Sequence, residues 1–330
     1  MSPCLIHPAD RIYVAGHRGM AGSAILRRLK AGGYGEAGGG ALLTPARAEL
    51  DLCDPVATAT WFEAQRPDVV VLAAARVGGI LANSSYPVEF LLENLKIQNH
   101  VIEQAWRQGC RRLLFLSSSC IYPRQAEQPI REQALLSGPL EPTNASYAIA
   151  KIAGIQLCRA LRQQHGFGAI CLMPTNLYGP GDNYHPTDSH VLPALIRRFD
   201  EARQSGAQEV ICWGTGTPRR EFLHVDDLAD AAVFCLERWQ PAAEELPFIN
   251  VGTGTDLTIA ETAARVAQAV GFRGRIGWDA SRPDGTPRKQ LDVSRLATLG
   301  WTARIPLEQG LAATVADYIQ RRSMGSEVRL

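Results

Sequence analysis

The feature that most constrains the fold is a glycine-rich turn that joins an apolar run to an amphipathic helix near the start of the chain. Residues 12–15 are apolar, Gly16, Gly19 and Gly22 follow, and residues 21–29 repeat apolar side chains with a helical period. Glycine lets a backbone approach a pyrophosphate closely, and the N-terminus of the next helix attracts the negative charge. The turn therefore predicts a strand–helix unit that binds a dinucleotide.

Apolar strands and helices continue to alternate after this turn. Residues 68–75 form an apolar run, as expected for the buried centre of a parallel sheet. After about residue 178 the pattern loosens, and a helix expected over 222–238 with a strand over 248–252 returns to the sheet. We predict an α/β protein, a Rossmann-type doubly wound parallel sheet with a smaller mixed α/β substrate lobe. Each part is built from two pieces of chain: residues 1–178 and 222–252 form the cofactor domain, and residues 179–221 and 253–330 form the lobe that binds the substrate.

The composition excludes several classes of protein. The chain has 330 residues and a formal net charge of +1, which argues against nucleic acid or an anionic membrane as the main partner. No apolar run reaches the roughly 18 residues that a membrane span needs, and the start lacks the basic and apolar regions of a signal peptide. The eight cysteines form no Cys-x-x-Cys pair, so we expect a cytoplasmic protein with reduced cysteines and no structural metal.

A tyrosine and a lysine, Tyr147 and Lys151, lie one turn apart on the same face of a predicted helix. A tyrosine holds its proton until about pH 10, and a neighbouring lysine cation is expected to lower that pKa toward the range of proton exchange with a carbonyl. Ser118 follows a predicted strand over 112–116, at the edge of the sheet where ligands bind. We expect Ser118 to hold a substrate carbonyl while Tyr147 protonates it. The order of glycine turn, serine and Tyr-x-x-x-Lys resembles the short-chain dehydrogenase/reductase superfamily.

The residues at the end of the second predicted strand indicate whether the cofactor is NAD or NADP. Enzymes that use NAD usually place an acid there for the ribose 2′-hydroxyl, but no acid precedes Glu49 in this region. Arg18 in the glycine turn and Arg47 are placed to clamp a 2′-phosphate, so we predict NADPH. Asp51, followed by Leu52, is similar to the acidic patch that the superfamily places near the adenine. The alternative is that this segment only caps the next helix.

Longer motifs resemble the GDP-L-fucose synthase family from about residue 11 to about residue 318. They are residues 16–20, 73–80, 118–123, 141–144, 147–154, 173–180, 183–185, 189–191, 219–227 and 282–289. The chain departs from the family at a longer glycine loop over 32–40, at both termini, and at Arg76, a position that we associate with lysine.

The resemblance implies a two-part reaction in which GDP-4-keto-6-deoxy-D-mannose is epimerised at C3 and C5 and then reduced at C4 by NADPH. Cys120 and His190 are the family's acid–base candidates for epimerisation; a buried cysteine and a core histidine are the alternatives. In an extended chain Cys120 shares the face of Ser118, and nearby cations are expected to lower its thiol pKa. His190 is expected to titrate near pH 6.5 and to supply a proton from the opposite face of the sugar.

The resemblance also implies the ligand contacts. The expected cofactor contacts are Gly16, Arg18, Gly19, Met20, Gly22, Arg47, Asp51, Leu52, Ala74, Tyr147, Lys151, Pro174, Asn176, Leu177 and His190. The expected contacts with the GDP-sugar are Asn176, Arg198, Trp213, Arg220 and Lys289. In the second set the cations suit the diphosphate, and Trp213 either stacks on guanine or packs in the core.

Two helices, expected over 89–108 and 146–164, commonly form a dimer interface in this superfamily, so we expect a C₂ homodimer. Two other functions are open. One is an epimerase-reductase for a related sugar such as the GDP-colitose precursor, which carries hydrogen instead of hydroxyl at C3. The other is a non-catalytic, NADPH-sensing regulator, against which the presence of Ser118, Tyr147 and Lys151 counts.

Overall fold

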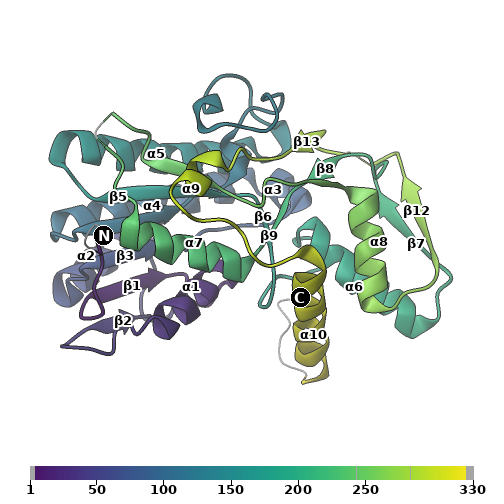
Figure 1. Cartoon of the computed structure of the whole chain (residues 1–330), viewed down its shortest axis with the longest axis horizontal. Coiled ribbons are helices and arrows are strands. Elements are labelled where there is room, and N and C mark those ends of the chain that lie inside the picture. Colours follow the sequence, from purple (N-terminus) through teal and green to yellow (C-terminus); the bar gives the residue numbers. More distant parts are fainter. Residues whose placement is uncertain (1–3, 243, 283, 325–330) are drawn as a thin grey trace.

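The computed structural model describes residues 4–242, 244–282 and 284–324, which form a helix-covered parallel sheet with a smaller lobe at one end (Figure 1). The six-stranded sheet has the order β10-β5-β4-β3-β1-β2, and every neighbouring pair is parallel. Its strands are β1 (Arg11–Ala15), β2 (Ala41–Leu43), β3 (Val69–Leu72), β4 (Arg112–Leu116), β5 (Ala169–Pro174) and β10 (Phe248–Val251). Because the strand order reverses at β1, a crevice is expected at the carboxyl ends of β1 and β3.

Alternate side chains of each strand face opposite layers of helices. Ile12 and Val14 of β1 pack in one cluster with α1 (Met20–Ala31) and α7 (Val225–Arg238). Tyr13 and Ala15 pack in the other cluster, with the helices on the opposite face. Those helices are α2 (Pro55–Gln65), α4 (Pro87–Arg107) and α5 (Ala145–His165). The sequence prediction of a doubly wound parallel sheet is confirmed.

The smaller lobe has its own apolar core, made mainly by three helices. They are α6 (Val191–Ser205), α8 (Ile259–Val270) and α10 (Leu307–Ser323). Two small sheets complete the lobe: β7 (Glu209–Trp213) with β12 (Arg275–Asp279), and β8 (Arg219–Arg220) between β11 (Leu257–Thr258) and β13 (Arg288–Lys289). Leu296 of α9 (Ser294–Thr298) and Trp301 pack instead in the α1 and α7 cluster, so this part of the C-terminal piece covers the sheet.

Three details of the sequence prediction are wrong. The strand expected over 68–75 is limited to Val69–Leu72, and the turn that contains α3 (Ile80–Ser85) was not expected. The helix expected over 222–238 begins only at Val225, because Phe222–His224 form β9, which pairs with β6 (Asn176–Tyr178). The His224 side chain accepts a hydrogen bond from the backbone of Asp226 and so caps α7.

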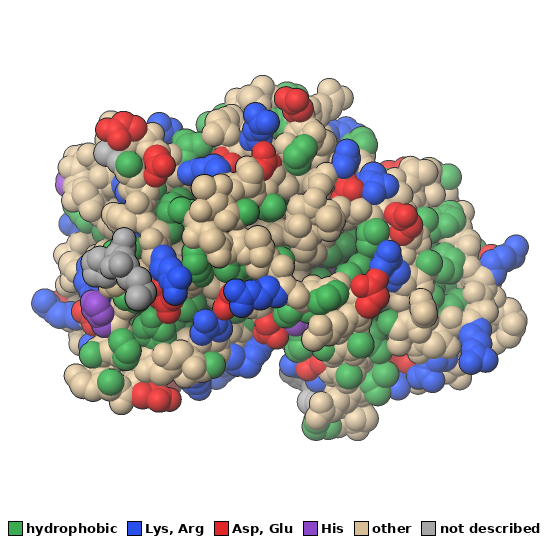
Figure 2. All heavy atoms as spheres, in the orientation of Figure 1, with side chains coloured by type: hydrophobic (Ala, Val, Ile, Leu, Met, Phe, Trp, Pro, Cys, Tyr) green, Lys and Arg blue, Asp and Glu red, His purple; other side chains and the backbone are tan. Residues whose placement is uncertain are grey.

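Short 3₁₀ turns connect several of these elements: η1 (Ser119–Ile121), η2 (Glu132–Ala134) and η3 (Pro142–Asn144). On the face of the molecule that Figure 2 shows, cationic and anionic side chains are scattered without a large patch of one sign. Within the described ranges, no helix has the length and apolar character to cross a membrane. The same residues contain no group of three or more His, Cys, Asp or Glu side chains arranged to hold a metal ion.

Candidate active site

One cleft of about 1060 Å³ is lined by residues of both the sheet and the lobe. A cleft for one small ligand has roughly 300–1,000 Å³, so this volume suits two ligands that meet inside it. Every site residue predicted from the sequence lines this cleft: Gly16, Arg18, Gly19, Met20, Gly22, Arg47, Asp51, Leu52, Ala74, Ser118, Cys120, Tyr147, Lys151, Pro174, Asn176, Leu177, His190, Arg198, Trp213, Arg220 and Lys289.

The glycine turn forms a close-packed cradle at the start of α1. Gly16 has a φ of +84°, and a Cβ there would lie 2.6 Å from the backbone nitrogen of Ala74. A Cβ at Gly22 would lie 2.2 Å from the carbonyl oxygen of Gly16. Gly19 is the N-cap of α1 and offers no side chain to its first turn. A pyrophosphate fits here, because the backbone is accessible and the helix terminus carries a partial positive charge.

The cleft beside this cradle carries two exposed arginines. Within the described part of the chain, Arg18 and Arg47 make no hydrogen bond or ion pair, so both guanidinium groups are available to a ligand. The alternative interpretation of the acidic segment, a helix cap, is confirmed for Asp54. Asp51 lines the cleft, whereas Asp54 is the N-cap of α2 and accepts hydrogen bonds from the backbone of that helix.

Tyr147 and Lys151 project from α5 toward the end of β4. Lys151 is buried, and its ammonium donates a 2.9 Å hydrogen bond to the carbonyl of Leu116. Its nitrogen lies 5.8 Å from the centroid of the Tyr147 ring. Burial lowers the pKa of Lys151 to about 8. Burial also raises the pKa of Tyr147 well above its ordinary value, so the lowered value expected from the Tyr-x-x-x-Lys spacing is wrong for this state.

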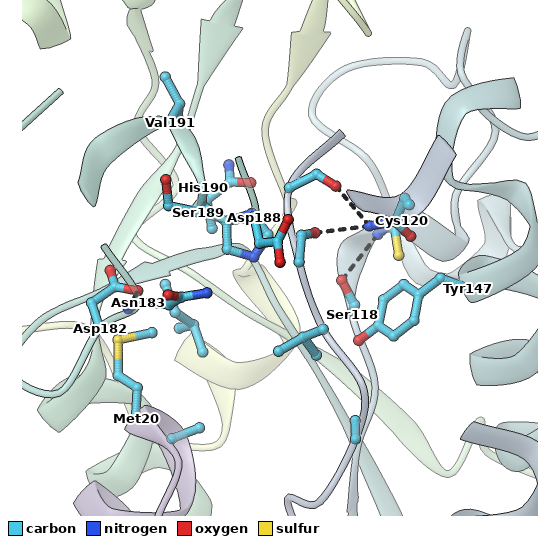
Figure 3. Close-up of a pocket in the computed structure, with 18 of the residues that line it drawn as sticks. Met20, Ser118, Cys120, Tyr147, Asp182, Asn183, Asp188, Ser189, His190 and Val191 are labelled. Atoms are coloured by element: carbon cyan, nitrogen blue, oxygen red, sulfur yellow. Dashed lines mark hydrogen bonds between the residues drawn. The ribbon is translucent and has the colours of Figure 1, made fainter. Parts of the chain in front are cut away.

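Ser118 and Cys120 lie on the same wall as Tyr147 (Figure 3). The chain does not stay extended as predicted: Ser118 is the N-cap of the 3₁₀ turn η1, and its oxygen accepts a 3.4 Å bond from the backbone nitrogen of Cys120. Burial raises the pKa of the Cys120 thiol, and the charges of Lys289 and Lys151 act in the opposite direction. The net effect is opposite to the lowered thiol pKa that we expected.

His190 belongs to the segment that faces this wall across the cleft, together with Asp188 and Ser189 (Figure 3). Its side chain is open to the cleft, but the surrounding protein and the charge of Lys289 lower its pKa to about 4. The prediction of a value near 6.5 is therefore wrong, and the imidazole is neutral at pH 7. A neutral imidazole is better suited to accept a proton than to supply one.

The lobe contributes the cations of the cleft. Lys289 of β13 and Arg220 of β8 are partners in the strand pairing, and burial lowers the pKa of Lys289 to about 8. Arg220 donates to the carbonyl of Arg219 at 2.8 Å, and Arg198 donates to the carbonyl of Ile211. A backbone carbonyl carries no charge, so these hydrogen bonds do not neutralise either guanidinium group.

Trp213 is not a core tryptophan, because 53% of its surface is exposed and it lines the cleft. The guanidinium of Arg282 lies 5.0 Å from its ring centroid, so the ring already accepts a planar group on its face. Asn176 is held in place by a 2.8 Å hydrogen bond from its side chain to the carbonyl of Glu221.

Three polar residues of the cleft had no role in the sequence prediction. Asp182 is buried, its Oδ2 has no hydrogen-bond partner among the described residues, and burial raises its pKa to about 7. Glu141 and Asn144 lie at the η3 turn just before α5. Asp182 lies in a stretch rich in glycine and proline, where an aspartate is typical of a turn. The motif at 141–144 was the only signal for the other two.

A parallel sheet with a glycine cradle, and with serine, tyrosine and lysine at its carboxyl edge, defines a nicotinamide-dependent enzyme of the epimerase and reductase class. Residues 12–252 match the family described as NAD dependent epimerase/dehydratase family.

Comparisons with individual proteins narrow this class. The chain is 54% identical to GDP-L-fucose synthase 1 of Arabidopsis thaliana over 94% of this chain and 93% of that protein. It is 51% identical to GDP-L-fucose synthase of Escherichia coli strain K12 over 95% of this chain and 98% of that protein. The solved structure of a GDP-L-fucose synthetase from Naegleria fowleri bound to NADP superposes with a TM-score of 0.87 at 26% identity, covering 99% of each chain. The chain belongs to the GDP-L-fucose synthases, within the NAD-dependent epimerase/dehydratase family.

Proposed function

We propose that this protein converts GDP-4-keto-6-deoxy-D-mannose to GDP-L-fucose by epimerisation at C3 and C5 followed by NADPH-dependent reduction at C4. The observation that carries this proposal is the single cleft, in which Ser118, Cys120 and Tyr147 share one wall and His190 faces them. Reduction and epimerisation can thus act on one sugar without its release. This chain belongs to the GDP-L-fucose synthases, which supports GDP-4-keto-6-deoxy-D-mannose as the substrate.

Bound NADPH supplies a hydride to the sugar carbon C4 in the reduction step. The Ser118 hydroxyl donates a hydrogen bond to the 4-keto oxygen, and Tyr147 transfers its phenolic proton to that oxygen as negative charge develops there. The raised pKa of Tyr147 keeps the phenol protonated before the reaction, as a proton donor requires. The Lys151 ammonium, which touches the Leu116 carbonyl at 2.9 Å, lies beside the ring and favours the phenolate that results.

Epimerisation precedes reduction, because the 4-keto group acidifies the C–H bonds on both neighbouring carbons. A base on one face removes the proton from C3 or C5, and an acid on the other face returns a proton with inverted configuration. At pH 7 the free site holds a neutral imidazole at His190 and a protonated thiol at Cys120. This pairing makes His190 the first base and Cys120 the first acid, the reverse of the roles that the sequence suggested.

We propose NADPH as the cofactor, with Arg18 and Arg47 on its 2′-phosphate and the glycine cradle on its pyrophosphate. Guanidinium groups match phosphate oxygens in pairs, and neither group is engaged within the described residues. The domains proposed are a cofactor domain of residues 1–178 and 222–252 and a substrate lobe of residues 179–221 and 253–330, of which Leu296 and Trp301 pack against the cofactor domain.

A cytoplasmic C₂ homodimer formed by α4 and α5 is also proposed. It is supported by the apolar side chains that these helices expose, Val88 and Leu92 on α4 and Ile149 on α5, which are 65%, 48% and 52% exposed. Two helices that leave such side chains in water can bury them against the same helices of a second copy.

Product analysis tests the proposed function. The protein is incubated with GDP-4-keto-6-deoxy-D-mannose and NADPH in D₂O, and the sugar nucleotide is identified by NMR and mass spectrometry. We expect GDP-L-fucose with deuterium at C3 and C5. Reduction without deuterium, or NADPH that is not consumed in the presence of this sugar, would contradict the proposal.

A further inference from the structure

Asn144 presents an amide to the cleft that nothing in the described part of the protein uses. It is the last residue of η3 and lies directly before α5, one turn from Tyr147. Its Oδ1 is buried without a hydrogen-bond partner, and among the described residues its Nδ2 donates to none. Buried polar atoms in folded proteins nearly always have partners. An unpaired amide on the wall of a ligand cleft therefore points to a ligand.

The rest of the same turn is already engaged. The Glu141 carboxylate accepts from Thr143 at 3.3 Å and from Thr286 at 3.3 Å, and it pairs with Arg124 at 3.2 Å. Asn144 is also the N-cap residue of α5, yet its side chain makes no capping hydrogen bond. Neither the turn nor the helix depends on this amide, so its loss removes no stabilising contact seen in the fold.

The position of Asn144 in the cleft places it near the C3 hydroxyl of a bound keto sugar. Asn144 and Tyr147 are three residues apart at the start of α5 and line the same cleft, so Asn144 adjoins the place where Tyr147 meets the reacting carbonyl. The carbon next to that carbonyl, C3, carries a hydroxyl. A hydroxyl both donates and accepts hydrogen bonds, and an amide side chain does the same.

We propose that Asn144 binds the 3-hydroxyl of the keto sugar and makes the enzyme selective for 3-hydroxy over 3-deoxy GDP-sugars; this rests on the proposed function. A 3-deoxy sugar leaves the amide unpaired inside the cleft. Sites that are built to hydrogen-bond a hydroxyl reject analogues without it for this reason.

The test compares kcat/KM for GDP-4-keto-6-deoxy-D-mannose and for its 3-deoxy counterpart. For Asn144→Ala we expect a loss of about tenfold or more with the hydroxylated substrate and less than about twofold with the 3-deoxy substrate. Ser146→Ala is the matched control, since Ser146 lies on the same turn and does not line the cleft. It is expected to change neither value. Asn144→Ser, which keeps a polar group, serves as a second variant. It should also lower the ratio of kcat/KM for the 3-hydroxy substrate to kcat/KM for the 3-deoxy substrate.

Equal losses with both substrates would overturn the inference, because they would mean that Asn144 only positions α5. The absence of any loss would overturn it as well. NADPH affinity and Tm of each variant are measured beside the kinetics, and we expect both to be unchanged. If the wild-type protein turns over neither substrate, the proposed function itself fails. If the wild-type protein turns over the 3-hydroxy substrate while the Asn144 variants keep the wild-type ratio of kcat/KM between the two substrates, only the role of Asn144 fails.

Discussion

Lys289 gives the sharpest test of how the cleft binds its anionic substrate. Its ammonium lies in the cleft beside Arg220, and burial lowers its pKa to about 8. A lysine with this pKa is almost fully charged at pH 6.5 and about one quarter charged at pH 8.5. If the charged form binds the diphosphate, the Kd of a GDP-sugar rises about fourfold over this interval. The direction follows from the sign of the charge: raising the pH removes the cation and weakens binding.

The measurement is the Kd of GDP-mannose by calorimetry from pH 6.5 to 8.5. We choose this ligand because its diphosphate has no group that titrates in this range. Lys289→Arg keeps a cation at every pH and should bind with a Kd that does not change over the interval. Lys289→Met removes the cation and should raise Kd about 10- to 150-fold at pH 6.5, as expected from the roughly 1.5–3 kcal/mol of a charge-assisted hydrogen bond.

Lys151 also has a pKa of about 8, but it contacts the Leu116 carbonyl on the sheet side of the cleft. Its titration should appear in kcat and not in the Kd of the sugar nucleotide. A wild-type Kd that is constant from pH 6.5 to 8.5 would refute the reasoning about Lys289. The same slope in Lys289→Arg as in the wild type would assign the titration to another group.

Three further changes test the rest of the site, and a fourth tests the packing of α5. Tyr147→Phe keeps the ring and loses the proton donor, so kcat for reduction should fall at least about 100-fold with unchanged NADPH affinity; near-normal turnover would contradict the assignment. Arg47→Ala should lower kcat/KM for NADPH about tenfold or more and leave that for NADH unchanged, and equal wild-type values for both cofactors would refute the preference. Cys120→Ser should lose inversion at C3 and C5, so that no GDP-L-fucose forms, while it retains NADPH binding; wild-type formation of GDP-L-fucose would return Cys120 to a packing role. Gly154→Ala should destabilise the fold by about 1–3 kcal/mol, measured by denaturant unfolding, because its Cβ would lie 2.7 Å from the Phe115 ring; an unchanged midpoint would contradict this.

The arrangement of the sheet could be predicted from the sequence because local patterns determine it. The glycine turn, the apolar run at 68–75 and the helical periods each depend on residues that are neighbours in the chain. The exception at 222–224 has a physical reason. Phe222, Leu223 and His224 are all buried, and they pair with β6, a distant segment that a local pattern does not reveal. Because β9 runs directly into α7, a strand of this length cannot be recognised from the sequence pattern alone.

The location of the candidate residues in the cleft could be predicted for a related reason, whereas their protonation could not. Ser118 was placed correctly in the cleft because it follows a strand of a parallel sheet, and ligands of such sheets bind at the carboxyl ends of their strands. The pKa values of Cys120 and His190 depend on burial by segments far away in the sequence and on Lys289, more than 90 residues later. Spacing along a chain carries no information about such contacts.

The charge of Lys289 therefore acts on both acid–base groups of the proposed epimerisation. It comes from the lobe, lowers the pKa of His190 and opposes the rise in the pKa of Cys120. When the diphosphate of the substrate pairs with Lys289, that charge is partly neutralised, and its effect on both groups weakens. The pKa of His190 then rises and the thiol of Cys120 holds its proton more firmly. The free site already holds the neutral imidazole and the protonated thiol, and substrate binding makes His190 a stronger base while Cys120 keeps its proton.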